Sequence, residues 1–194
     1  GDIRNYEDLI SIDKVDIIID SSAEPSVLAG LSTNPRKLIN INLLGTTNCL
    51  EFARQKKTRL IFLSSSRVYP IEPINDAMYE EQDTRYQWID NQEISGVSGS
   101  GISENFPLVG YRSFYGATKL ASELLIDEYA QYYDLETIIN RCGVVTGPWQ
   151  MAKVDQGFVA LWLLKHYYCG TLTYNGYNGL GKQLRDVLHI DDLS

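Results

Sequence analysis

The run Arg59-Leu-Ile-Phe-Leu-Ser64 is a short apolar segment that leads into a row of serines, Ser64 to Ser66. This pattern is typical of a strand buried on both faces of a parallel sheet. A second run of this kind, Val15-Asp-Ile-Ile-Ile-Asp20, lies upstream and is also followed by small polar residues. The two runs together predict a parallel sheet.

Helical patterns alternate with these strands. Between Pro35 and Lys56 the residues that share one helical stripe are Leu38, Ile41, Leu44, Thr47, Leu50 and Ala53. A further helix is predicted from Ser113 to Tyr133, followed by a strand over Thr137–Asn140. Strand, helix, strand, helix, strand in this order implies right-handed crossovers and an α/β fold with a doubly wound parallel sheet.

The periodicity stops from Pro70 to Gly110 and resumes later. Residues 71–110 contain one base, Arg85, and eight acids: Glu72, Asp76, Glu80, Glu81, Asp83, Asp90, Glu93 and Glu104. We interpret this segment as a solvated surface insertion, with a lid over the functional site as the alternative. Closer to the C-terminus, Gln156–Tyr168 predicts a helix and Thr171–Tyr174 a short strand.

Composition and charge exclude several classes of function. The net charge of -8 and the pI near 4.7 argue against a nucleic-acid surface, which needs clustered Lys and Arg. The three cysteines, Cys49, Cys142 and Cys169, are widely spaced and form no CxxC pair, so we expect neither a disulfide framework nor a metal site. No apolar run is long enough for a membrane span and the start does not resemble a signal peptide, so we expect a soluble, cytoplasmic protein.

Polar and small residues follow three of the predicted strands. These are Asp20-Ser-Ser-Ala23, Ser64-Ser-Ser66 and Asn140-Arg-Cys142. Ligands of an α/β sheet bind at the carboxyl ends of the strands, where these residues gather. Each run taken alone is equally typical of a strand end or a turn.

The run Tyr115-Gly-Ala-Thr-Lys119 lies at the start of a predicted helix. The i, i+4 spacing places Tyr115 and Lys119 on one face, one turn apart. A nearby ammonium favours the phenolate, so we expect Lys119 to lower the pKa of Tyr115 and make it a base for a substrate hydroxyl. The spacing alone does not separate a catalytic pair from two neighbours on a helix surface.

Ser65 strengthens the catalytic interpretation of this pair. It lies at the end of the strand that precedes the helix, where a hydroxyl can hydrogen-bond both the reacting alcohol and the tyrosine. Ser65, Tyr115 and Lys119 together provide an orienting group, a base and an electrostatic activator.

These residues resemble the extended short-chain dehydrogenase/reductase family of NAD-dependent epimerases and dehydratases. The resemblance extends over nearly the whole chain and includes four further runs: Asn42-Leu-Leu-Gly45-Thr46, Ser65-Ser66-Arg67-Val68-Tyr69, Arg141-Cys-Gly-Val-Val-Thr-Gly147-Pro148 and Arg185-Asp-Val-Leu-His189. It implies a Rossmann-type fold, bound NAD, a nucleotide-sugar substrate and a catalytic set of Ser65, Tyr115 and Lys119.

The resemblance also implies a set of binding residues. The residues that it assigns to the cofactor are Asp2, Ile3, Ser21, Ser22, Ala23, Asn42, Tyr115, Lys119 and Gly143. Ser66 and Arg185 are assigned to the substrate, with Arg185 holding the diphosphate as guanidinium groups do. A structural salt bridge is the alternative role of Arg185.

Within the family, the sequence is most similar to the CDP-paratose 2-epimerases (CDP-tyvelose 2-epimerases). Runs that carry this similarity include Ser66-Arg-Val-Tyr-Pro70, Asn140-Arg-Cys-Gly143, Asp155-Gln-Gly157 and Gly181-Lys-Gln183. That branch implies epimerisation of a CDP-hexose at C2 through a transient keto-sugar. The alternatives are a dehydratase or net dehydrogenase/reductase of the same family, or a non-catalytic Rossmann-like module.

Two departures from the family pattern bear on the reaction, and the first of them disfavours water elimination and so favours epimerisation. Related dehydratases commonly carry an Asp-Glu pair after the active-site hydroxyl, where this chain has Ser66 and Arg67. Val144 occupies a position at which dehydratases and 4-epimerases often hold a substrate phosphate with Asn.

The resemblance also predicts the organisation of the chain. The Gly-rich turn with which the family begins is not found, so we expect residues 1–150 to form a partial NAD-binding Rossmann domain without its first strands. Residues 151–194 are expected to begin a substrate-binding region, and the segment alone is expected to be inactive. The helices at 35–56 and 113–133 are expected to form the interface of a homodimer or larger homo-oligomer.

Overall fold

A computed structural model describes residues 1–28, 30, 34–153, 156–174, 179–181 and 183–194. The chain divides into two units. The first comprises Gly1–Ile71 and Leu108–Cys142, and the second comprises Glu72–Pro107 and Gly143–Ser194. Asp155 and Lys182, from two of the runs that carried the sequence similarity, lie outside the described residues.

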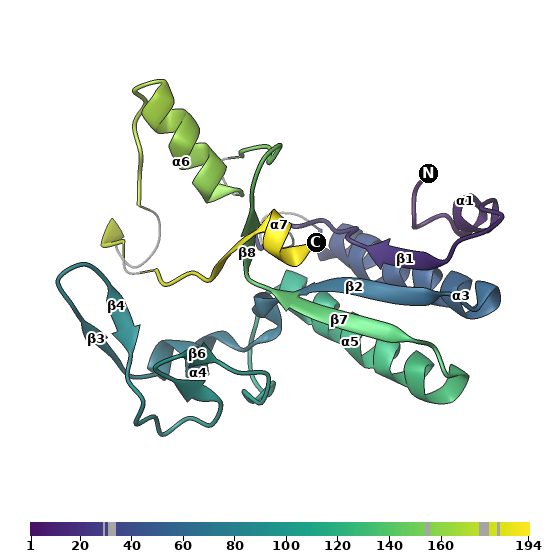
Figure 1. The fold of residues 1–194 in the computed structure, drawn as a ribbon, viewed down its shortest axis with the longest axis horizontal. Helices are drawn as coiled ribbons and strands as arrows, with labels where there is room; N and C mark the ends of the chain where they lie inside the picture. The colour runs from purple at the N-terminus through teal and green to yellow at the C-terminus, as the bar shows by residue number, and fades with distance from the viewer. Residues whose placement is uncertain (29, 31–33, 154–155, 175–178, 182) are drawn as a thin grey trace. The chain divides into compact units, whose positions relative to one another are not determined.

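A three-stranded parallel sheet forms the centre of the first unit (Figure 1). Its strands, in spatial order, are β1 (Ile17–Asp20), β2 (Arg59–Ser65) and β7 (Thr137–Cys142). The register pairs Asp20 with Phe62 and Ser65 with Cys142. The predicted parallel sheet is therefore confirmed, and the polar residues that follow the strands lie along one edge of it.

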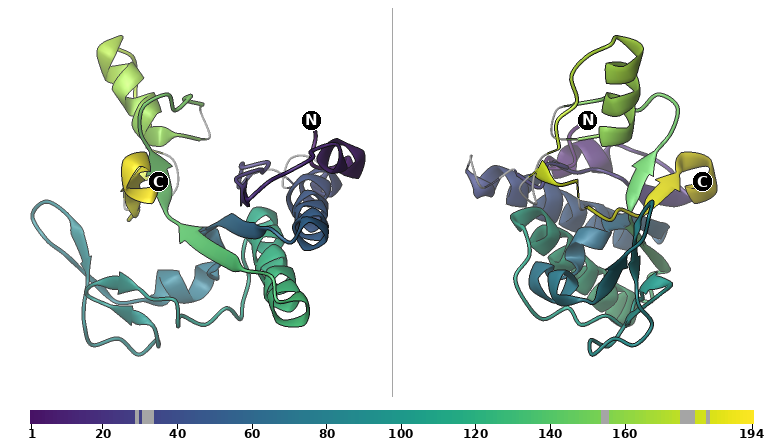
Figure 2. Two further views of the ribbon diagram at one scale, coloured as in Figure 1. Left: turned by 45° about the vertical axis from the view of Figure 1, so that its right-hand side comes forward. Right: turned by 90° about the vertical axis from the view of Figure 1, so that its left-hand side faces the viewer.

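Helices cover one face of this sheet. Figure 2 shows α3 (Gly45–Lys56) and α5 (Phe114–Tyr133) on the same side of β2 and β7. The helical segment predicted from Pro35 begins with α2 (Pro35–Ile39) and continues through a π-helical segment, Asn40–Leu44, into α3. The π-helical turn was not predicted, because the apolar spacing is nearly the same in an α-helix. The short helix α1 (Tyr6–Ile10) completes the unit.

Alternation along β2 divides its residues between the two faces of the sheet. Leu60 and Phe62 are fully buried against the helices, in a cluster whose buried members are Leu50, Ala53, Leu60, Phe62, Ile126 and Leu135. On the other face, Ile17, Ile19 and Ile138 are 46%, 63% and 54% exposed. The apolar core of the first unit thus lies between the sheet and α3 and α5.

The second unit consists of short elements. β8 (Val144–Thr146) pairs in parallel with β9 (Val187–His189), which leads into α7 (Ile190–Leu193). α6 (Phe158–Tyr167) confirms the predicted helix, whereas Thr171–Tyr174 contains no strand, so that prediction was wrong. No strand among the described residues pairs with Thr171–Tyr174, and four apolar or β-branched residues do not by themselves form a strand.

The acidic segment, residues 71–110, contains regular secondary structure that its lack of periodicity did not predict. It contains α4 (Ile71–Asp76) and two antiparallel hairpins, β3 (Tyr79–Glu81) with β4 (Tyr86–Trp88) and β5 (Val97–Ser98) with β6 (Gly101–Ile102). Strands of two or three residues are too short to leave a periodic pattern in the sequence. Across the part of the chain that the structure describes, no helix has the length and apolar character required to cross a membrane.

We predict that the buried face of α5 contributes far more to stability than its exposed face. Ile126→Ala removes a fully buried side chain and should lower the free energy of unfolding by about 2–5 kcal/mol. The matched control is Leu124→Ala on the same helix, 60% exposed, which should change this free energy by about 0.5 kcal/mol or less. Urea denaturation measures both, and equal losses would contradict the packing described here.

Candidate active site

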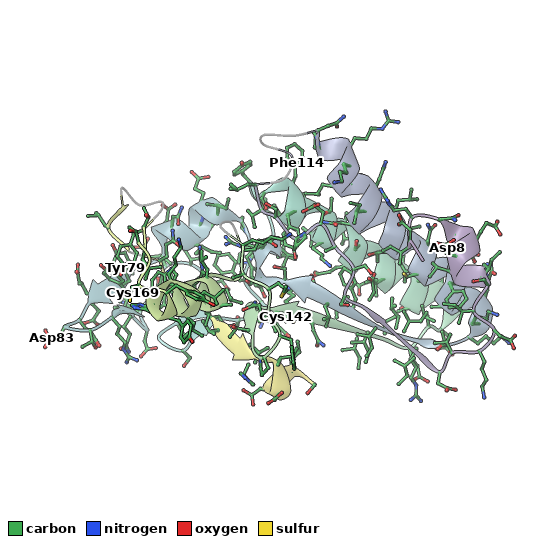
Figure 3. The ribbon with its side chains drawn as sticks, turned by 90° about the horizontal axis from the view of Figure 1, so that it is seen from above. Asp8, Tyr79, Asp83, Phe114, Cys142 and Cys169 are labelled. Carbon is green, nitrogen blue, oxygen red and sulfur yellow. The ribbon has the colours of Figure 1, made fainter. Side chains whose placement is uncertain are left out.

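Ser65, Tyr115 and Lys119 come together at the carboxyl end of β2. Ser65 is the last residue of that strand, and the other two lie in the first two turns of α5 (Figure 3, where Phe114 marks the start of α5 and Cys142 the end of β7). Ser113 fixes the start of the helix, because its side chain accepts a hydrogen bond from the Gly116 amide at 3.1 Å. The three residues predicted to be catalytic therefore share one site.

Ser65 is held in a defined orientation. Its side chain is buried, and its Oγ accepts a hydrogen bond from the Arg67 amide at 3.1 Å. That bond closes the 3-10 turn Ser66–Val68, which follows β2 directly. The Ser65 side chain also lowers the pKa of the Tyr115 phenol, so the hydroxyl lies beside the phenol.

Lys119 is one of the most buried charged residues of the first unit, with 2% of its surface exposed. Its Nζ donates to the Leu63 carbonyl at 2.8 Å and lies 4.3 Å from the centroid of the Phe62 ring. Burial lowers the pKa of Lys119, and the nearby Asp20, Cys142 and Glu123 oppose this effect. An ammonium has three N–H donors, so the Leu63 carbonyl leaves donors for a ligand.

The pKa of Tyr115 corrects one of our expectations. Burial raises this pKa above its ordinary value, and the groups that oppose burial are the Ser65 side chain and the Arg67 guanidinium. We expected Lys119 to lower it, but the Lys119 ammonium is directed to the Leu63 carbonyl. Ser65 and Arg67 are consequently the groups that favour the phenolate of Tyr115.

Gly116 allows the close approach of α5 to the turn after β2. A Cβ at this position would lie 2.0 Å from the Arg67 carbonyl oxygen, which is too close for any side chain. The backbone of Arg67 therefore lies against the residue that follows Tyr115. This contact explains why glycine occurs between Tyr115 and Ala117.

Asn42 and Asp20 shape the segment that follows β1. Asn42 is 1% exposed, and its side chain accepts from the Glu24 amide at 2.7 Å and donates to Thr118 Oγ1 at 3.2 Å. Asp20 accepts from the Ser22 amide at 3.0 Å and from Thr46 Oγ1 at 2.8 Å. These bonds tie the segment after β1 to α3 and α5.

The predicted cofactor residues Ser21, Ser22 and Ala23 lie in this segment. Ser21 is exposed, and Ser22 and Ala23 are half-buried. Their small side chains, together with the donors of Lys119, form a polar edge that fits the ribose and phosphates of a dinucleotide. Asn42 supports that edge through the bonds described above.

Asp2 and Ile3 lie at the other end of the predicted cofactor set. The Arg4 guanidinium hydrogen-bonds the Asp2 carboxylate and holds its pKa at about 2, so this acid is charged at neutral pH. Ile3 lies against α3, where a Cβ at Gly45 would be 2.4 Å from Ile3 Cδ1. The Ile3 carbonyl also accepts from Asn48 Nδ2 at 2.8 Å, so α3 holds this segment in place.

Gly143 and Arg185 belong to the second unit. A Cβ at Gly143 would lie 2.5 Å from Asp186 Oδ2, and the Val144 amide donates to the Asp186 carbonyl at 2.7 Å. Arg185 is exposed, and its guanidinium donates to the Leu184 carbonyl and to Gln183 Oε1, both at 3.3 Å.

Three buried polar residues beside this site were not among the predicted site residues. They are Asp20, Ser64 and Glu123. Glu123 lies four residues after Lys119, and that spacing on a helix is the signal that identifies it. Asp20 and Ser64 lie in the strand-end runs that the sequence did single out.

A separate hollow of the first unit lies away from these residues. It has a volume of about 970 Å³ and is lined by residues 13–17, 54, 56–59 and 133–136, at the amino edge of β1 and β2. Ser65, Tyr115 and Lys119 lie at the opposite, carboxyl edge of the sheet. Ligands of parallel α/β sheets bind at the carboxyl edge, so we assign the site to the polar cluster.

Comparisons of the sequence with known proteins identify a family and a relative. The model of the NAD dependent epimerase/dehydratase family matches residues 1–194. CDP-paratose 2-epimerase of Salmonella typhi is 31% identical over 204 residues, an alignment that covers 100% of this chain and 56% of the relative. The chain therefore spans little more than half the length of that relative.

Solved structures confirm the expected Rossmann-type fold. Pal from Bacillus thuringiensis matches 100% of this chain and 53% of its own, with a TM-score of 0.78 at 23% identity. A double mutant of DesIV, a dTDP-glucose 4,6-dehydratase from Streptomyces venezuelae solved with NAD bound, matches all of this chain and 50% of its own. Its TM-score is 0.72 at 26% identity.

We predict that Ser65→Ala moves the ionisation of Tyr115 to higher pH. The Ser65 side chain lowers the pKa of Tyr115, so its removal leaves the effect of burial less opposed. Tyrosine ring NMR with Tyr115 assigned by Tyr115→Phe measures the titration. Ser66→Ala, one residue further on, is the control and should leave the titration in place; a shift to lower pH in Ser65→Ala would contradict the prediction.

We also predict that Gly116→Ala destabilises the site despite the better helix propensity of alanine. The added Cβ would meet the Arg67 carbonyl oxygen, and such overpacking costs about 1–3 kcal/mol. Ala117→Ser adds one heavy atom to the exposed side of the same turn and is the control. Thermal unfolding compares the two, and a Gly116→Ala variant as stable as the control would show that the contact is absent.

Proposed function

Because the chain belongs to the NAD dependent epimerase/dehydratase family, we propose that the full-length protein epimerises a nucleotide sugar by transient oxidation to a keto-sugar and re-reduction. The observation that carries this proposal is the convergence of Ser65, Tyr115 and Lys119 at the carboxyl edge of the sheet. The substrate that we propose is a CDP-hexose, inverted at C2. The 31% identity to a CDP-paratose 2-epimerase supports this choice.

NAD is the cofactor of this family, and when bound it supplies the acceptor and donor of a hydride. The donors of Lys119 and the small residues Ser21, Ser22 and Ala23 fit it, with Asp2, Ile3, Asn42 and Gly143 as further proposed contacts. All other chemistry belongs to residues of the chain.

Tyr115 is the proposed proton carrier. Its phenolate accepts the proton of the sugar hydroxyl when the ketone forms, and its phenol returns that proton when the hydroxyl is restored. Ser65 orients the hydroxyl of the substrate, since its own hydroxyl lies beside the phenol and lowers the pKa of Tyr115. Arg67 supplies positive charge that stabilises the phenolate against the cost of burial, and Lys119 offers its remaining N–H donors to the cofactor.

Epimerisation is favoured over water elimination by the charges beside the reacting tyrosine. The side chain that follows Ser65 and Ser66 is the cation Arg67, and it lowers the pKa of Tyr115. Elimination of water requires an acid to protonate the departing hydroxyl, and a guanidinium does not give up its proton. A dehydratase is the second candidate, because the structure of the dehydratase DesIV matches the whole of this chain.

Two further residues and the assembly complete the proposal. Ser66 contacts the sugar and Arg185 holds the diphosphate, to which its exposed guanidinium is suited. The protein acts as a homodimer or larger homo-oligomer, for which the exposed Ile39 and Leu44 on the helical segment and Tyr133 on α5 provide apolar surface. The cysteines Cys49, Cys142 and Cys169 are in the reduced state, which suits a reducing cytoplasm.

We predict that Tyr115→Phe lowers kcat of the full-length protein by about 10²–10⁴, because the substitution removes the proton carrier. Tyr132→Phe, 77% exposed on the same helix, is the control and should leave kcat unchanged. Product is followed by NMR of the sugar, with CDP-, UDP- and dTDP-hexoses tested in parallel. Undiminished turnover in Tyr115→Phe would make the catalytic assignment wrong.

The same assay separates the candidate reactions. Epimerisation produces no net reduction of NAD, so NADH should not accumulate as product forms. A stoichiometric rise in NADH would identify a net dehydrogenase, and a product that has lost water would identify a dehydratase. Absence of turnover with every nucleotide sugar would support a non-catalytic Rossmann-like module.

A further inference from the structure

A buried ion pair lies directly behind the catalytic residues. Glu123 is 3% exposed, and its carboxylate accepts from Arg141 Nε at 3.1 Å and from Arg141 Nη2 at 2.8 Å. The Ser64 hydroxyl donates to the same carboxylate. Glu123 lies one turn after Lys119 and two turns after Tyr115, so the three residues share one face of α5.

Arg141 connects this carboxylate to the turn after β2. Its Nη1 donates to the Tyr69 hydroxyl at 3.3 Å, and its guanidinium carbon lies 5.3 Å from the centroid of the Tyr69 ring. Ser64 and Arg141 are also register partners in the pairing of β2 with β7. One carboxylate on α5 therefore engages both strands at the level of the site.

The residues that contact Glu123 are immediate sequence neighbours of residues at the site. Ser64 immediately precedes Ser65, and Arg141 immediately precedes Cys142, which is paired with Ser65 in the sheet. Lys119 Nζ meets the Leu63 carbonyl one residue before Ser64. A shift of α5 along β2 would break all of these contacts together and separate Tyr115 from Ser65.

Packing alone does not account for an ion pair in this position. Removal of a carboxylate and a guanidinium from water is costly, and an apolar pair of similar volume commonly gives equal or greater stability. The pair does have an electrostatic effect that an apolar pair would lack. Glu123 opposes the lowering of the Lys119 pKa by burial, together with Asp20 from β1 and Cys142 from β7.

We propose that the Glu123–Arg141 pair is the positioning element of the site, which holds α5 against β2 and β7 so that Tyr115 meets Ser65 and Lys119 keeps its charge. The proposal rests on the proposed function, because Glu123 and Arg141 influence the reaction only by positioning the residues proposed to be catalytic. Glu123 and Arg141 thus act as positioning residues for Ser65, Tyr115 and Lys119.

Two variants of the full-length protein test this proposal. Glu123→Gln keeps the shape of the side chain and removes its charge. The double variant Glu123→Met with Arg141→Met removes both charges and should regain thermal stability lost in the single variant. The matched control is Glu136→Gln, which breaks the ion pair between Glu136 and Arg59. The Glu136 side chain is 71% exposed, so this pair should contribute little.

Three measurements are made on each variant: kcat and KM, the pH profile of kcat, and the titration of Lys119 by NMR of labelled lysine side chains, assigned with Lys119→Met. We expect kcat to fall about tenfold to a hundredfold with KM nearly unchanged. The Lys119 titration and the alkaline limb of the profile should both move to lower pH, because an anion that favours the ammonium is lost. Glu136→Gln should match the unmodified protein.

The double variant distinguishes positioning from simple stabilisation. Restored stability with a low kcat and a shifted Lys119 titration supports the proposal. Restored stability with the original kcat and titration would overturn it, since the pair would then be only structural. If neither the unmodified protein nor any variant turns over a nucleotide sugar, the proposed function fails. The Lys119 titration then still tests the proposal, because an unchanged titration in Glu123→Gln would show that Glu123 does not stabilise the Lys119 ammonium.

Discussion

The ammonium of Lys119 is buried between α5 and β2, where it donates to the Leu63 carbonyl at 2.8 Å and lies 4.3 Å from the Phe62 ring centroid. A charge with 2% exposure is tolerated only where hydrogen bonds and opposite charges replace water. The sheet meets this requirement with a backbone carbonyl, an aromatic face and the carboxylates of Asp20 and Glu123. The buried charge of Lys119 thus requires compensating groups from β1, β2 and α5 around it.

The parallel sheet explains why these residues meet. The carboxyl ends of β1, β2 and β7 lie at one edge, so Asp20, Ser65 and Cys142 come together although they are far apart in the sequence. α5 then passes back along the sheet with Tyr115, Lys119 and Glu123 on the face that meets β2. Gly116 permits this approach, because a side chain there would collide with the Arg67 carbonyl.

The sequence predicts those parts of the fold in which local pattern and tertiary environment agree. The apolar run that became β2 and the helix that became α5 are both buried and regular, and both were predicted nearly to their ends. β8 and β9 were missed, because each has only three residues and depends on pairing between distant segments. Thr171–Tyr174 failed for the opposite reason, since it has the composition of a strand without a paired neighbour.

The active site shows the same division between residue identity and environment. Residue type and spacing identified Ser65, Tyr115 and Lys119, but they gave the wrong direction for the pKa of Tyr115. That direction depends on burial and on where the Lys119 ammonium points, and neither is encoded in an i, i+4 spacing. The phenolate is therefore favoured by Ser65, the last residue of β2, and by Arg67 in the turn that follows it. The ionisation of Tyr115 therefore depends on the geometry of the turn Ser66–Val68. The Arg67 carbonyl lies against Gly116, so this turn contacts the helix α5 that carries Tyr115.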